Sequence, residues 1–196
     1  ASLDLNSNYN KIINVNQSIT GYQINPAITN LSSGGYVIIW NSQDNINPEE
    51  HFDIIAQRYL TDGSKYGDNF QVNIQQRKYQ SLPTVACCQL TNSNHYIVCW
   101  VNYNINTNKY YIYCQIFHNN LPISPNDIEI TSVDLPNILS NPRVAGLYNG
   151  NYIVVWDQDN GSGILNIVGT VIIDTPNSAL TINTPFPINP TSPSVS

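Results

Sequence analysis

A five-residue apolar motif that ends in tryptophan occurs three times in this chain, at residues 36–40, 96–100 and 152–156. The copies read YVIIW, YIVCW and YIVVW, and each follows a short apolar segment that contains a proline. The spacing is about 58 residues, and self-similarity at a fixed period of this size indicates a repeat architecture. The repeat constrains the fold more strongly than the length of 196 residues does.

Each repeat predicts four short antiparallel strands, because alternating Val, Ile and aromatic residues are separated by Gly, Asn and Asp turns. We therefore expect an all-β fold of about three tandem four-stranded units that resemble propeller blades. The expected strands cover residues 27–31, 36–40, 54–60 and 70–73, then 84–90, 96–101, 110–117 and 128–131, then 143–147, 152–156, 167–173 and 186–189.

The repeats define one three-repeat β domain over residues 1–174, with repeats at about 26–73, 83–131 and 142–189. Residues 12–16 are expected to form an odd fourth strand that lacks its three partners. The segment 175–196 is rich in Pro, Thr and Ser, which suits a linker or a strand donated to another copy. Residues 192–195 resemble the start of a further repeat. Incomplete repeats at both ends favour strand exchange, and a fragment cut out of phase is the alternative.

The composition points to a neutral polar surface. Hydrophobic residues make up 41% of the chain, but charged residues only 10%, against about a quarter in ordinary domains. The net charge is -6 and the seven cations form no patch, so we expect neither nucleic acid nor anionic membrane as a partner. The apolar runs are too short to insert into a bilayer. The absence of methionine predicts a processed chain or a fragment.

All four cysteines, Cys87, Cys88, Cys99 and Cys114, lie in the second repeat. A hairpin turn at Asn106-Thr107 would place Cys99 directly opposite Cys114, which makes a cross-strand disulfide geometrically feasible. A secreted chain usually oxidises its thiols. The alternative is that the cysteines are small buried hydrophobic residues.

Three Asn-x-Ser/Thr acceptor sites occur at Asn16, Asn30 and Asn160, each in or beside an expected turn. A glycan would be accommodated at such positions in a secreted protein. Because Asn, Ser and Thr are abundant here, chance alone explains the number of sites.

Few residues suggest a metal site or catalysis. Asp157 and Asp159 resemble a weak calcium loop, although an ordinary Asp/Gly hairpin loop is favoured. The histidines His51, His95 and His118 fall at expected loop or strand ends and are interpreted as exposed. No nucleophile motif or paired carboxylate accompanies them. We therefore expect no enzyme activity, no cofactor and no bound metal.

The three motif tryptophans, Trp40, Trp100 and Trp156, allow two interpretations. Aromatic faces stack on sugars, but recurrence at one strand position more often marks a packing layer. We favour the core for all three.

The segments 34–40 (GGYVIIW), 55–63 (IAQRYLTDG) and 69–73 (NFQVN) resemble repeats of large secreted and cell-surface proteins, including bacterial adhesin-like and haemolysin-type proteins. The resemblance covers about residues 12–173 and is closest in the first repeat. It implies β-propeller-like blades, an extracellular or cell-surface location, and binding or scaffolding. It transfers no catalytic residue.

Two functional hypotheses follow. The first is an extracellular structural glycoprotein that assembles with copies of itself into a filament or surface coat. The second is a carbohydrate-binding or adhesive module whose partners are glycans.

Overall fold

The computed structural model describes residues 12–18, 20–43, 52–74, 79–88, 94–159, 161–174 and 180–188. This part of the chain is all-β, as expected, and is organised as three antiparallel sheets. It contains no helix, and so no helix with the length and apolar character needed to cross a membrane.

The first sheet has the strand order β1-β2-β3-β4. Its second and third strands are the most buried, because they alternate β-branched and aromatic residues that face the core. The strands are β1 (Gln23–Asn30), β2 (Tyr36–Gln43), β3 (Phe52–Tyr59) and β4 (Lys65–Gln71).

The second and third sheets repeat this order, but the fourth position is divided between two strands. Both members of each pair bond to the third strand of their sheet. The second sheet has β5 (Gln80–Cys87), β6 (Tyr96–Asn104), β7 (Lys109–His118), β8 (Leu121–Pro122) and β9 (Ile128–Asp134). The third has β10 (Ile138–Gly146), β11 (Tyr152–Asp159), β12 (Leu165–Ile173), β13 (Thr181–Ile182) and β14 (Phe186–Pro187).

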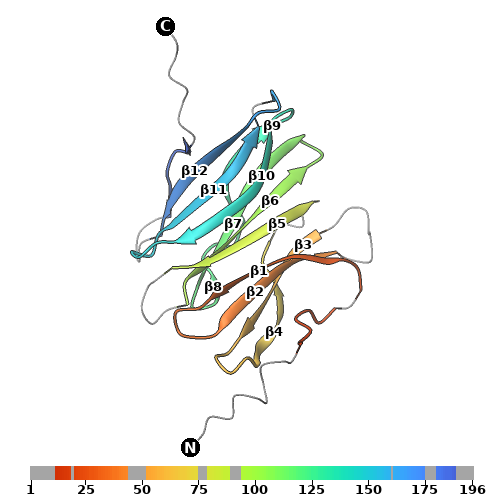
Figure 1. The fold of residues 1–196 in the computed structure, drawn as a ribbon, viewed down its shortest axis with the longest axis vertical. Helices are drawn as coiled ribbons and strands as arrows, with labels where there is room; N and C mark the ends of the chain where they lie inside the picture. The colour runs from red at the N-terminus through yellow and green to blue at the C-terminus, as the bar shows by residue number, and fades with distance from the viewer. Residues whose placement is uncertain are drawn as a thin grey trace, which may run out of the picture.

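The three sheets follow one another along the long axis of the molecule (Figure 1). Their first strands meet, with β1 packed on β5 and β5 packed on β10. The sheets therefore succeed one another as blades do, with the first strand of each on the side where neighbouring sheets meet.

Each first strand contains the same irregularity. The ladder to the second strand shifts register at one place, between Ile24 and Ala27 in β1 and at the matching places in β5 and β10. At each bulge a residue with positive φ precedes a proline: Asn25 (φ 54), Leu82 (φ 51) and Asn141 (φ 49). Proline has no N–H to contribute to a ladder, and a bulge accommodates it.

One sequence prediction about the chain ends needs correction. Residues 12–16 form no strand; they lie beside β4, where the Lys65 ammonium donates to the carbonyl of Val15. After residue 174, β13 and β14 both pair with β12, and β14 lies where the fourth strand of the third repeat is expected, at residues 186–189. Residues 192–195 lie outside the described residues.

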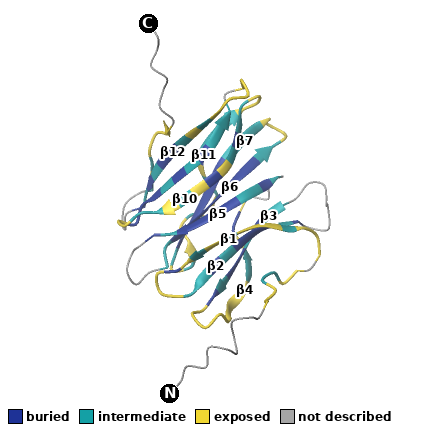
Figure 2. Ribbon diagram, viewed as in Figure 1, coloured by how far each residue is buried: buried dark blue, intermediate teal, exposed yellow. Residues whose placement is uncertain are grey.

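The core consists of two clusters, one between the first and second sheets and one between the second and third. Buried residues are concentrated in the middle sheet, along β5 and β6 (Figure 2). Trp40, Trp100 and Trp156 are 4%, 0% and 1% exposed, which confirms that the recurring tryptophan is a packing residue.

Gly146 allows β10 to approach β5 closely. A Cβ atom at this position would lie 2.0 Å from the carbonyl oxygen of Cys87 and 2.7 Å from the Cα of Cys88. Those distances are far inside van der Waals contact, so only glycine fits at this junction of the second and third sheets.

Candidate functional site

A groove runs over the first strands where the three sheets meet. Its volume is about 350 Å³, and residues of all three sheets line it. The lining residues are Asn25, Pro26, Ala27 and Ile28 of β1, Leu82, Pro83, Thr84 and Val85 of β5, and Arg143 of β10.

The bulges bring together the chemistry of this groove. Two proline rings, Pro26 and Pro83, give it apolar walls, and the Asn25 amide and the Arg143 guanidinium give it hydrogen-bond donors. The Asn25 amide donates to Asn41 Oδ1 at 3.2 Å, and Arg143 donates to the carbonyl of Pro142 at 2.9 Å. These contacts orient both groups and leave further N–H donors, because an amide nitrogen has two and a guanidinium has five.

A smaller hollow of about 120 Å³ shares Pro26 with the groove. Its floor includes Trp40, whose indole N–H donates to Gln23 Oε1 at 2.7 Å. Its walls are mostly apolar, including Val15, Ile24 and Ile38. Groove and hollow therefore adjoin at Pro26.

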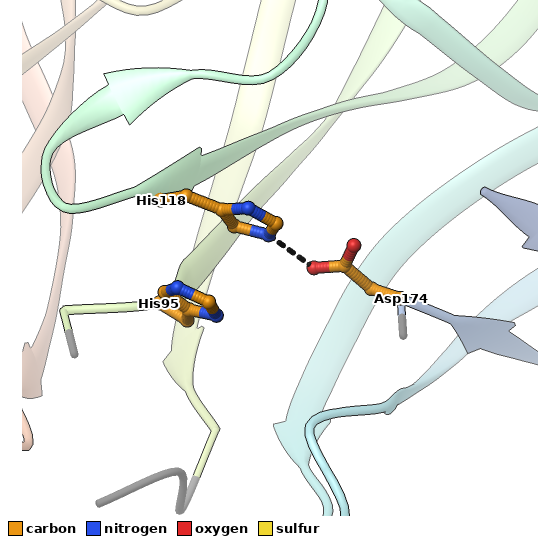
Figure 3. Close-up of side chains that lie close together, drawn as sticks. All are labelled: His95, His118 and Asp174. Carbon is orange, nitrogen blue, oxygen red and sulfur yellow. Dashed lines mark hydrogen bonds and ion pairs between the residues drawn. The ribbon is translucent and has the colours of Figure 1, made fainter. Parts of the chain in front are cut away.

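A second group of polar side chains lies between the second and third sheets. His118 ends β7, His95 immediately precedes β6, and Asp174 immediately follows β12. His118 Nε2 lies 2.6 Å from Asp174 Oδ2, and the two imidazole rings stack with centroids 3.9 Å apart and planes 9° apart (Figure 3). Burial, together with the neighbouring His118, lowers the pKa of His95.

These histidines are not the exposed loop residues that the sequence suggested. Both are half-buried, and they meet because the β6–β7 register pairs Cys99 with Cys114 and Tyr96 with Phe117. One further step along this register leads to His95 and His118. The hairpin register expected from the sequence therefore already contained this contact. His51 lies outside the described residues.

The cysteine register is confirmed. Cys99 and Cys114 are direct partners across β6 and β7, and both are fully buried. All four cysteines are free thiols in the structure, Cys87 being half-buried and Cys88 buried. Burial raises the pKa of the Cys99 thiol well above its ordinary value. A disulfide between Cys99 and Cys114 stays a prediction.

The glycan acceptors differ in their surroundings. Asn30 is exposed at the end of β1, whereas Asn16 lies against the smaller hollow and its amide donates to the carbonyl of Ser18. Asn160 lies outside the described residues. Glycosylation at these sites stays a prediction.

The weak calcium candidates make local hydrogen bonds. Asp159 accepts from the backbone N–H groups of Gly161 and Gly163 at 2.9 and 3.1 Å, and Asp157 accepts from the Asn141 amide at 2.8 Å. These bonds are typical of an Asp/Gly hairpin loop. Among the described residues, the group that brings metal-ligand atoms together is a different one, namely His95, His118 and Asp174.

No protein-family model and no curated protein matches the sequence. A similar fold is found in the crystal structure of an endo-1,4-β-xylanase from Bacteroides thetaiotaomicron. The TM-score is 0.52 at 9% sequence identity, and the match covers 84% of this chain. The chain spans 60% of the length of that structure. At this identity the likeness concerns the fold alone.

Proposed function

We propose that this chain is a carbohydrate-binding module of a secreted or cell-surface protein, and that the groove over the first strands is its binding site. The observation that carries the proposal is the groove itself, which gathers proline rings, an amide and a guanidinium from three sheets. Its volume of about 350 Å³ lies within the range of small-molecule sites.

The groove suits the chemistry of sugars. A sugar ring presents C–H groups on its faces and hydroxyl groups around its edge, so it needs apolar walls together with fixed donors and acceptors. Pro26 and Pro83 provide rigid apolar walls, while Asn25 and Arg143 provide donors already held by other bonds. Groups that are ordered before binding lose little entropy when a ligand arrives.

Arg143 also gives the groove a preference. It carries the only charge among the described lining residues, on a chain whose net charge is -6. A guanidinium binds a carboxylate through two parallel hydrogen bonds. We therefore expect glycans with uronic acids to bind more tightly than neutral glycans of the same length.

The structure with a similar fold is named as an endo-1,4-β-xylanase, an enzyme of carbohydrates. This likeness agrees with the proposal, but the xylanase name describes that protein. The filament hypothesis receives less support. It rested on an unpaired strand at residues 12–16 and on a donated strand near the C-terminus. The former is not a strand, and residues 192–195, the expected start of a further repeat, lie outside the described residues.

A glycan array with the intact chain, followed by calorimetry on the best ligand, tests the proposal. Arg143→Ala is expected to weaken binding of an acidic glycan at least about tenfold, since charge-assisted hydrogen bonds contribute about 1.5–3 kcal/mol each. Ile28→Asp, which places a charge on an exposed lining residue, is expected to weaken binding of all glycans.

Lys109→Ala is the matched control, because it removes one cation that does not line the groove. It should leave the affinity unchanged. Absence of binding to every glycan, or equal affinity in Arg143→Ala and Lys109→Ala, would contradict the proposal.

A further inference from the structure

We propose that His95, His118 and Asp174 form a binding site for a divalent transition metal of the zinc class, which links the second sheet to the third. The observation is their convergence: one ligand atom from each residue lies within 4.8 Å of the other two. The site shares no residue with the described lining of the groove. A test of metal binding is therefore independent of the test of carbohydrate binding.

The donor set selects the metal. Two imidazole nitrogens and one carboxylate oxygen are typical ligands of Zn²⁺, which accepts three protein ligands and keeps a fourth position for water. Calcium and magnesium ions prefer oxygen ligands and bind imidazole nitrogen weakly. The side chain of His118 is 32% exposed, so solvent reaches the cluster, whereas the side chain of Asp174 is only 7% exposed.

The backbone around the three residues is already held in place. The N–H of Asp174 donates to Asn151 Oδ1 at 3.2 Å, and the carbonyl of His95 accepts from the N–H of Cys88 at 3.1 Å. Hydrogen bonds that fix the surroundings of ligands are a regular part of metal sites. A site assembled before the ion arrives loses less entropy on binding.

One buried polar atom of the cluster lacks a hydrogen-bond partner in the described part of the chain, which agrees with a site for an ion. Nδ1 of His95 is buried and has no hydrogen-bond partner among the described residues. Leaving a buried nitrogen unsatisfied costs about 1–3 kcal/mol, and other buried atoms of the described residues, such as the Tyr96 hydroxyl and Trp100 Nε1, share this state. Turning the imidazole toward an ion would make one ring nitrogen a ligand and free the other to find a new partner.

Only small movements are needed to admit an ion. Zinc bonds of about 2.0–2.2 Å in a tetrahedral arrangement place the ligand atoms about 3.3 Å apart. The His118–Asp174 contact of 2.6 Å must widen, and one of the stacked rings must rotate so that its nitrogen faces the ion (Figure 3). Both changes are side-chain rotations at positions where the backbone is held.

Calorimetry on the EDTA-treated chain, titrated with ZnCl₂ and separately with CaCl₂, tests the proposal. We expect one Zn²⁺ per chain and no comparable heat from Ca²⁺. Asp174→Asn and His95→Gln should each weaken zinc binding at least about tenfold, the lower range found even for residues that only support ligands. Asp134→Asn, which changes an exposed carboxylate elsewhere, is the matched control and should bind like the parent.

Cobalt substitution identifies the ligands. Co²⁺ bound to nitrogen and oxygen should give visible absorption without the intense near-ultraviolet band of a cobalt–thiolate bond. A thiolate band would move the site to the nearby cysteines and overturn the assignment. Failure of the parent chain to bind Zn²⁺, or equal zinc affinity in His95→Gln and Asp134→Asn, would also overturn it. Circular dichroism of each variant verifies that the fold is kept, and His95→Gln decides if Asp174→Asn does not fold.

Discussion

Gly146→Ala is expected to separate the second and third sheets and to destabilise the fold markedly. The added Cβ would lie 2.0 Å from the carbonyl oxygen of Cys87, and its other near neighbours are also backbone atoms of Cys87 and Cys88. No side chain can rotate away, so β10 must move back from β5 by more than an ångström to reach ordinary contact.

The magnitude follows from this displacement. A gap of about 0.5–1 Å already removes a quarter to a half of the dispersion energy between facing atoms. Overpacking in a closely packed core typically costs about 1–3 kcal/mol, and this clash with rigid backbone belongs at the upper end. We therefore expect Gly146→Ala to lower the free energy of unfolding by about 3 kcal/mol.

Urea unfolding followed by tryptophan fluorescence measures the change. Gly67→Ala is a useful comparison, because nothing lies within 4 Å of its added Cβ and only its φ of +70° is unfavourable. That variant should lose about 1–2 kcal/mol, the cost of a left-handed conformation for a non-glycine residue. If Gly146→Ala proves no more destabilising than Gly67→Ala, the close approach of β10 to β5 is refuted.

Three further predictions concern the thiols and the response to acid. In the native protein, iodoacetamide should label Cys87 before Cys99. Burial raises the pKa of both thiols, but Cys87 is half-buried and Cys99 is fully buried. Labelling of Cys99 first, detected by peptide mass mapping, would contradict the packing. If Cys99 and Cys114 form the predicted disulfide, neither will label in urea until a reductant is added. The pKa of Asp62 lies below its ordinary value of 3.8, because its carboxylate accepts hydrogen bonds from the hydroxyl and the backbone N–H of Ser64. The ionised carboxylate therefore stabilises the fold above pH 3.8, and this contribution is lost as the pH falls through the lowered pKa. Asp62→Asn should therefore show a smaller fall in melting temperature than the parent between pH 5 and pH 2, roughly the window in which a carboxylate with a lowered pKa titrates.

The second and third strands of each repeat could be predicted closely from the sequence. Tyr36, Tyr96 and Tyr152 begin β2, β6 and β11 as expected, because a run of β-branched residues between turn signals has few alternatives to a buried strand. The expected fourth strands at 70–73, 128–131 and 186–189 correspond to β4, β9 and β14, but with shifted bounds. The two-residue strands β8 and β13 were not expected, because they carry no alternating pattern of their own.

The candidate sites could be predicted only in part. The hairpin register that pairs Cys99 with Cys114 also brings His95 to His118, so two of the three cluster residues could be predicted from the sequence. Asp174 comes from the next sheet, and no local pattern reveals a contact between sheets. The same holds for the groove, since Asn25 and Arg143 are more than a hundred residues apart and meet only when the sheets pack.

The repeated proline bulge has a consequence for how the sheets remain distinct. The first strand of each sheet is a free edge, and three such edges lie near one another with amide and carbonyl groups capable of joining. A proline and a backbone turned into the left-handed region interrupt that edge in all three strands. Natural β proteins protect exposed edges against unwanted pairing by such means. The interruption therefore opposes the fusion of adjacent blades into one continuous sheet, even where β10 approaches the backbone of β5 closely at Gly146.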